Sequence, residues 1–284
     1  MKIIQGQKFE EERSLYGLRD TLVLDCQFGG LVDGESPLKE GRDYEVKDCD
    51  INLRYPCWHA KNAKIIASRF HENSRAPFWY CRDLTVEDCE IKTIKAFREC
   101  QDTKLNHIVA QSDEFFWRSQ DTKAKDLKLE GVYAFFENED LEIEGMEFKG
   151  KYSFQYGKNL VIKNSALDTK DAFWHVKGAR IENCVLKGEY LAWYSENLTF
   201  VNCRIEGTQP FVDCKGLRLI NCKMHDTDLS FENSEVEAEV TTPLVSVKNP
   251  RTGWIKAPEI GQIIFDEFAL PPRAKLIVGG KEIQ

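Results

Sequence analysis

The chain has 284 residues, of which 30% are charged and 42% hydrophobic, and its formal net charge is -8 at pH 7. This acidic balance argues against binding to nucleic acid or to an anionic membrane surface, because both would repel the protein. No apolar run approaches the roughly 18 residues that a membrane helix needs. The N-terminal residues lack the hydrophobic core of a signal peptide, so we expect a cytoplasmic protein whose ten cysteines are reduced.

Residues 1–20 are predicted to form an N-terminal cap and a first coil, because the segment that follows is a tandem repeat. From Asp83 to Glu235, equivalent residues return every 19 positions without interruption. Two upstream units fit the same pattern if extra loop residues are allowed, one ending at Asp20 and one at Asp43. A fixed period of this length predicts a solenoid, and we assign its repeat coils to residues 21–235.

Each repeat opens with alternating apolar and polar residues, as in Leu198–Ile205, which is the pattern of a half-buried strand. The fifth position is commonly Asn, Asp or Gly, residue types that accept a sharp bend. The 3.6-residue periodicity of helical repeats is absent. Two positions repeat an apolar side chain and predict stacked columns in the core. They are the Cys column at position six (Cys26, Cys49, Cys89, Cys184, Cys203 and Cys222) and the Phe column at position fourteen (Phe78, Phe97, Phe116, Phe135, Phe154, Phe173, Ala192 and Phe211).

These features predict an all-β protein, a single-stranded parallel β-helix of about twelve coils with caps at both ends. After Glu235 the period fades, and residues 236–284 are predicted to supply the last strands and the C-terminal cap. The whole chain, residues 1–284, then forms one domain.

Four short segments follow one another in the first part of the chain: Glu12–Gly17 (ERSLYG), Gly34–Gly41 (GESPLKEG), Arg54–His59 (RYPCWH) and Arg75–Tyr80 (RAPFWY). In this order they resemble an uncharacterised bacterial family, a domain of unknown function with a pectin-lyase-like β-helix. The resemblance covers nearly the whole chain and implies a right-handed coil. It implies no established activity and therefore no catalytic residues.

Two further rows run beside the Phe column. A buried Arg without a partner is costly, so Arg98 indicates that the row at position fifteen faces outward or lies at a corner. The opposite arrangement, with the Trp side chains inside and the Phe side chains outside, stays open. The second row is too polar for the core in either case. The rows are the Trp row at position fifteen (Trp58, Trp79, Arg98, Trp117, Phe136, Gln155, Trp174 and Trp193) and the outer row at position sixteen (His59, Tyr80, Glu99, Arg118, Glu137, Tyr156, His175, Tyr194 and Asp213).

When the repeats are aligned with one another, charged and aromatic residues of these rows lie together near the N-terminal end. Glu35, Arg54 and Arg75 share a further column in the same region. One interpretation is salt bridging between coils that fixes their register; the other is a site for a carbohydrate or a small anionic ligand. The candidate ligand-binding residues are Glu35, Lys39, Glu40, Arg54, Trp58, His59, Arg75, Trp79, Tyr80, Arg98 and Glu99.

We therefore expect a carbohydrate-binding or scaffold protein that uses this aromatic and charged face, with a homo-oligomer interface as a further interpretation of the exposed rings. The alternative is a polysaccharide lyase or glycoside hydrolase with its site in the N-terminal charged cluster and His59 as the candidate general base. Glu99 and Glu137 lie two coils apart, but Arg118 between them favours a surface charge network. No Ser-His-Asp, P-loop or metal-binding pattern is present, so we assign no catalytic residue, no metal and no cofactor.

Overall fold

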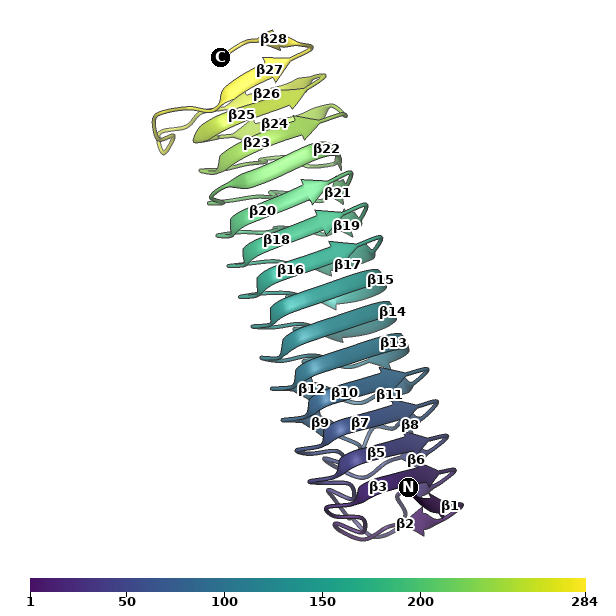
Figure 1. The fold of residues 1–284 in the computed structure, drawn as a ribbon. Helices are drawn as coiled ribbons and strands as arrows, with labels where there is room; N and C mark the ends of the chain where they lie inside the picture. Colours follow the sequence, from purple (N-terminus) through teal and green to yellow (C-terminus); the bar gives the residue numbers. More distant parts are fainter. The chain divides into compact units, whose positions relative to one another are not determined.

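The computed structural model describes residues 1–284 and divides into two compact units, Met1–Glu147 and Phe148–Gln284. All of its regular elements are β-strands, and the chain has no helix that could span a membrane. Within each unit, strands of successive coils are parallel, so the fold is the predicted right-handed parallel β-helix (Figure 1). The assignment of the whole chain to one domain stays a prediction.

In the first unit, long strands form one parallel ladder in the order β1, β3, β5, β7, β10, β13 and β14. Short strands form a second ladder, β2, β4, β6, β8 and β11, which continues into β13. Arg19 pairs with Arg42, so this coil contains the extra loop residues predicted before Asp43. The strands are β1 (Lys2–Gln5), β2 (Lys8–Phe9), β3 (Arg19–Leu24), β4 (Gln27–Phe28), β5 (Arg42–Lys47), β6 (Asp50–Ile51), β7 (Lys61–Ile66), β8 (Arg69–Phe70), β9 (Phe78–Trp79), β10 (Arg82–Glu87), β11 (Glu90–Lys92), β12 (Phe97–Arg98), β13 (Gln101–Gln111), β14 (Gln120–Val132) and β15 (Glu139–Lys151), the last of which ends in the second unit.

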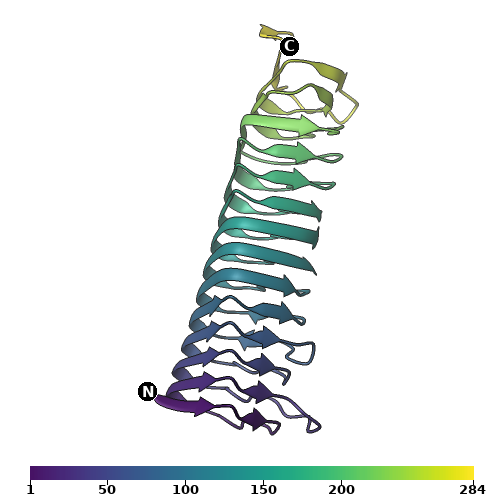
Figure 2. The same ribbon diagram turned by 90° about the vertical axis from the view of Figure 1, so that its right-hand side faces the viewer.

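In the second unit the main ladder runs through β16, β18, β20, β22, β23, β25 and β27. The final strand, β28, is antiparallel to β27, and the segment between β26 and β27 loops away from the coils (Figure 1). A view turned by 90° shows the same succession of coils (Figure 2). The strands are β16 (Lys158–Lys163), β17 (Ala166–Lys170), β18 (Lys177–Glu182), β19 (Val185–Lys187), β20 (Glu196–Val201), β21 (Arg204–Glu206), β22 (Leu217–His225), β23 (Glu235–Val240), β24 (Leu244–Lys248), β25 (Thr252–Ala257), β26 (Ile260–Ile264), β27 (Lys275–Val278) and β28 (Lys281–Glu282).

The chain makes about 15 turns, more than the twelve predicted. The additional coils lie after Glu235, where the sequence period fades but parallel pairing continues from β23 to β25 and β27. Glu235 pairs with Thr252, so this coil is shorter than the regular repeat. The change of length hides these coils from a search for a constant period.

The Phe column is the core in both units, as predicted. In the first unit the rings of Phe78, Phe97 and Phe116 stack with centroid separations of 4.6 and 4.2 Å and interplanar angles of 14°. In the second unit Phe154 and Phe173 stack at 4.7 Å, and all five side chains are fully buried. Burial of each ring contributes about 1.5–3 kcal/mol. Because the Phe column faces inward, the Trp row lies at the outer side of the coil.

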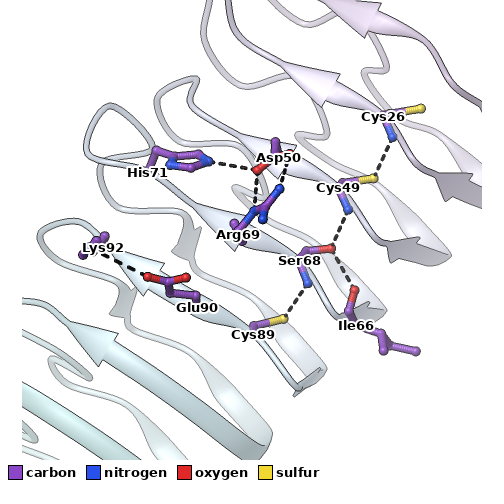
Figure 3. A network of polar contacts seen from close by, with 10 residues as sticks. All are labelled: Cys26, Cys49, Asp50, Ile66, Ser68, Arg69, His71, Cys89, Glu90 and Lys92. Carbon is purple, nitrogen blue, oxygen red and sulfur yellow. Dashed lines mark hydrogen bonds and ion pairs between the residues drawn. The ribbon is translucent and has the colours of Figure 1, made fainter.

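The Cys column also packs inside, and its thiols have a hydrogen-bonding role (Figure 3). The Cys26 amide donates to Cys49 Sγ at 3.3 Å, the Cys49 amide donates to Ser68 Oγ at 3.1 Å, and the Ser68 amide donates to Cys89 Sγ at 3.4 Å. A Ser can therefore replace a Cys in the column, because either side chain accepts the amide of the preceding coil. Burial raises the pKa of Cys49 to about 12, so this thiol stays protonated.

The outer row lies at corners where the backbone is left-handed. The φ angles are 60° at His59 and 56° at Tyr80, and Glu40, which extends the outer row into the preceding coil, has a φ angle of 61°. This conformation costs roughly 1–3 kcal/mol for a residue other than glycine, so the surrounding structure must hold it. Here the next coil does so: the His59 amide donates to the Trp79 carbonyl at 2.8 Å. Each corner therefore directs one side chain outward in every coil.

Candidate functional site

Two stacked indoles form the centre of the predicted site. The rings of Trp58 and Trp79 lie 5.5 Å apart with an interplanar angle of 15°. Lys39, from the preceding coil, places its Nζ 3.9 Å from the Trp58 centroid, and Arg98, from the following coil, lies 5.6 Å from that of Trp79. Cations thus cover the outer faces of the pair, and each contact contributes about 0.5–1 kcal/mol. Because the faces are occupied, these half-buried rings present their edges to the surface.

His59 and Tyr80 form the exposed layer beside the indoles. His59 Nδ1 lies 3.1 Å from a carboxylate oxygen of Glu40. The imidazole meets the Tyr80 ring edge to face, with centroids 5.2 Å apart, and Tyr80 also stacks against Trp79 at 5.5 Å. Tyr80 is 40% exposed. A ligand on this surface would meet a carboxylate, an imidazole and a phenol in succession.

Arg98 is the cation that the sequence placed within the Trp row. Its side chain is only 17% exposed, and it pairs with Glu114 at 2.8 Å. The guanidinium also lies over Trp117, 5.4 Å from the ring centroid. The charge is therefore compensated by a carboxylate and by aromatic faces, which explains how an Arg is tolerated at a half-buried position.

The remaining predicted residues are less closely connected. Arg54 Nη2 lies 3.2 Å from an Asp33 oxygen and 3.7 Å from a Glu35 oxygen, an ion pair between neighbouring coils. Arg75 and Glu99 share the expected columns but have no side-chain hydrogen bond or ion pair with the others. The structure therefore joins Lys39, Glu40, Trp58, His59, Trp79, Tyr80 and Arg98 by direct contacts, and Glu35 with Arg54 as a separate pair.

Sequence reasoning missed a polar network formed by residues of β6, of β8 and of the turn that follows β8 (Figure 3). Asp50 accepts two hydrogen bonds from Arg69, at 2.7 and 2.8 Å, and its Oδ1 lies 3.0 Å from His71 Nε2. The Arg69 bonds, followed by that of His71, lower the pKa of Asp50 to about 2. A surface hollow of about 300 Å³ lies beside it, lined by Asn52, His71, Glu72, Asn73 and Lys92.

A larger hollow, of about 410 Å³, lies in the second unit and was also missed. Apart from Tyr194 and Cys214, the lining residues are charged or amide types that form no motif in the sequence. The available signal was the outer row, where the aromatic and imidazole side chains end at Tyr194 and a short carboxylate follows at Asp213. The lining residues are Tyr194, Glu196, Asp213, Cys214, Lys215, Asn233, Glu235 and Arg251.

The parallel ladders, inward Phe column and left-handed corners place the protein in the class of right-handed parallel β-helices. The chain belongs to the family described as "Protein of unknown function (DUF3737)", whose model matches residues 2–278. This agrees with the resemblance carried by the four N-terminal segments. No curated protein matches the sequence.

Several solved structures are similar in fold. A tailspike protein mutant of E. coli bacteriophage HK620, in complex with a hexasaccharide, has 7% identity and a TM-score of 0.49, covering 93% of this chain and 66% of the tailspike. Tailspike protein 3 of bacteriophage CBA120 has 10% identity and a TM-score of 0.44, covering 98% and 56%. The catalytic domain of GH87 alpha-1,3-glucanase, in complex with tetrasaccharides, has 8% identity and a TM-score of 0.39, covering 98% and 64%. The chain spans less than two thirds of each of these proteins, and at such identities the likeness concerns the fold alone.

Proposed function

We propose that the protein binds an extended oligosaccharide along the outer row of its first unit. The observation that carries this proposal is the succession of Glu40, His59, Tyr80 and Glu99 at left-handed corners of consecutive coils. Coils are about 4.8 Å apart, so a carboxylate, an imidazole, a phenol and a second carboxylate follow at regular intervals. An elongated polymer lying along the coils would meet all of them.

A carbohydrate suits this row because its hydroxyl groups both donate and accept hydrogen bonds. The ionised carboxylates of Glu40 and Glu99 only accept hydrogen bonds, whereas His59 and Tyr80 can donate or accept them. The hydroxyl groups of one saccharide can pair with all four side chains. The two carboxylates would repel a small anion, so the row favours an uncharged saccharide over an anionic ligand. The stacked Trp pair beneath holds the row rigid, which lowers the entropic cost of binding.

A glycan array probed with the full chain tests this proposal. We expect the wild type to bind a subset of oligosaccharides, and Tyr80→Ala and His59→Ala to lose most of the signal. Tyr16→Ala is the matched control, because Tyr16 is an exposed tyrosine of the same unit that lies outside the outer row. Absence of any bound glycan, or equal signals from the control and the two row variants, would contradict the proposal.

One contact favours a catalytic function as the second candidate. Glu40 lies 3.1 Å from His59 Nδ1, an arrangement in which a carboxylate orients an imidazole that acts as a general base. A polysaccharide lyase or hydrolase would then release new chain ends. We expect His59→Ala to abolish that release without lowering the melting temperature; wild-type protein that binds a glycan and leaves it intact would exclude this candidate.

A further inference from the structure

The second unit carries a stack of exposed rings that ends at the larger hollow. Tyr156 stacks on His175 with centroids 4.9 Å apart and an angle of 12°, and His175 stacks on Tyr194 at 5.0 Å and 14°. Trp174 and Trp193 meet Tyr194 edge-on, at 6.4 and 6.1 Å. Tyr194 is thus held in orientation by three neighbours and is 42% exposed.

The face of Tyr194 turned away from His175 forms a wall of the hollow. The outer row continues in the next coil with Asp213, whose short side chain leaves empty the space that another ring would fill. The buried Cys214 lies at the floor. The hollow of about 410 Å³ falls in the range typical of small-molecule sites, roughly 300–1,000 Å³.

Several polar groups around this wall lack a partner, although Asn233 has a side-chain hydrogen bond with Asp213. Lys215 and Arg251 are in no ion pair, and the buried Nε of Arg251 has no acceptor. The buried Oδ1 of Asn233 has no donor, and Glu235 is in no ion pair either. Because both of these atoms are buried, a ligand in the hollow would instead reach the charged ends of Lys215, Glu235 and Arg251, which are in no ion pair.

The charges of the hollow balance. Glu196 is already engaged by Lys177, at 3.9 Å, which leaves Lys215 and Arg251 against Asp213 and Glu235. An anion would satisfy the two cations but be repelled by the two carboxylates, and a cation would meet the reverse situation. Burial, and after it Glu232, raises the pKa of Asp213, whereas a hydrogen bond from Asn233 and the charge of Arg251 act in the opposite direction.

From this geometry we propose that the hollow binds one ring of a neutral saccharide, which continues the stack of Tyr156, His175 and Tyr194. The apolar face of the sugar would lie on Tyr194, and its hydroxyls would reach the charged groups of Lys215, Glu235 and Arg251. This site is separate from the outer row of the first unit and does not depend on that row binding a ligand.

Saturation-transfer NMR on the full chain tests this site with methyl glycosides of glucose, galactose and their N-acetylhexosamines, and with methyl glucuronide as the charged probe. We expect at least one neutral glycoside to bind, methyl glucuronide to bind more weakly, and Tyr194→Ala to weaken binding about tenfold through the loss of ring stacking. Tyr156→Ala is the matched control, because it removes an exposed ring of the same stack that does not line the hollow. Its affinity should be within about twofold of the wild type.

Three results would overturn the proposal: no neutral glycoside bound, stronger binding of the glucuronide, or equal losses in the two tyrosine variants. Tyr194→Phe guards against a folding artefact, because it keeps the ring and should keep most of the affinity. Repeating the titration with Tyr80→Ala separates the two sites. Binding that survives Tyr80→Ala but not Tyr194→Ala belongs to this hollow, and the opposite pattern assigns it to the first unit and contradicts the inference.

Discussion

The two units each contain a stacked pair of tryptophans in the Trp row, but the pairs differ in their hydrogen bonds. Trp174 and Trp193 stack at 5.2 Å, and their Nε1 atoms donate to the carbonyls of Tyr190 and Gln209 at 2.7 and 2.8 Å. In the first unit, Trp58 and Trp79 stack at 5.5 Å, yet both of their Nε1 atoms are buried without an acceptor.

Because of this difference, we expect the two pairs to contribute unequally to stability although their stacking is similar. The indoles of the second unit are tied to the following coil, which makes them structural members of the repeat. Those of the first unit are held by ring contacts and by the cations Lys39 and Arg98. Each of their unpaired Nε1–H donors costs about 1–3 kcal/mol. Such an uncompensated group is more easily retained where the surface has a function than where it serves the fold alone.

The largest expected effect tests whether the two cores are equally well packed. Phe97→Ala and Phe173→Ala each remove a fully buried, stacked ring and should lower the free energy of unfolding by about 3–5 kcal/mol. Chemical denaturation of both variants, followed by circular dichroism, measures the losses. A clearly smaller loss in one unit would show that its column is not packed as the structure indicates.

The indole hydrogen bonds provide a more direct test of the contrast. Trp174→Phe leaves the Tyr190 carbonyl without its donor and should cost about 1–2 kcal/mol. Trp79→Phe removes a donor that has no acceptor, which offsets part of the lost ring area, so its cost should be smaller by about 1 kcal/mol. Equal costs in urea titrations would mean that water or another group satisfies the Trp79 donor.

Two aspartates should respond to pH with opposite sign. The pKa of Asp50 is lowered to about 2 by Arg69 and His71, so its contribution is present at neutral pH and is lost as the pH falls through 2. Asp50→Asn should therefore destabilise the protein at pH 7, by less than about 1 kcal/mol because the pair is largely exposed. The pKa of Asp213 is raised by burial, so its ionisation opposes folding and Asp213→Asn should stabilise slightly at pH 7. Melting temperatures measured from pH 7 to pH 2 should show both differences from the wild type shrinking at low pH. Shifts of the same sign for both variants at pH 7 would contradict this assignment.

The smallest effect concerns the cysteines, which are buried in both units. Burial raises the pKa of Cys57 and of Cys214 to about 12, and only the thiolate reacts rapidly. We expect iodoacetamide to leave all ten thiols of the native protein unmodified and to label them after denaturation, as mass spectrometry would show. Rapid labelling confined to one unit would identify local opening of its coils.

Much of the fold could be predicted because one coil constrains the next. Phe116 stacks against Phe97 of the preceding coil and Phe135 of the following coil. The 19-residue period alone therefore predicts which residues form the Phe column and where the chain bends. The coils after Glu235 escaped because their lengths vary and their marker residues disappear. Periodicity identifies residues that share a row, but it gives no contacts; Arg75 and Glu99 fall in the right columns and still lack partners.

The hollow beside Tyr194 could not be predicted for a related reason. Its shape depends on the difference in size between Tyr194 and Asp213 and on the position of Arg251, which lies beyond the regular repeat. A period describes what is constant from coil to coil, whereas a cavity arises where the repeat changes. Sites on solenoids of this kind are best sought at breaks in an otherwise regular row.

The reversed strand β28 has a consequence for self-assembly. By pairing with Ile277 and Val278 it occupies the edge of β27, where the backbone of another molecule would otherwise add in parallel. A chain shortened before Gly279 would expose that edge as a template, and we expect it to polymerise end to end into fibres. Strand β28 would then prevent further molecules from adding to the edge of β27.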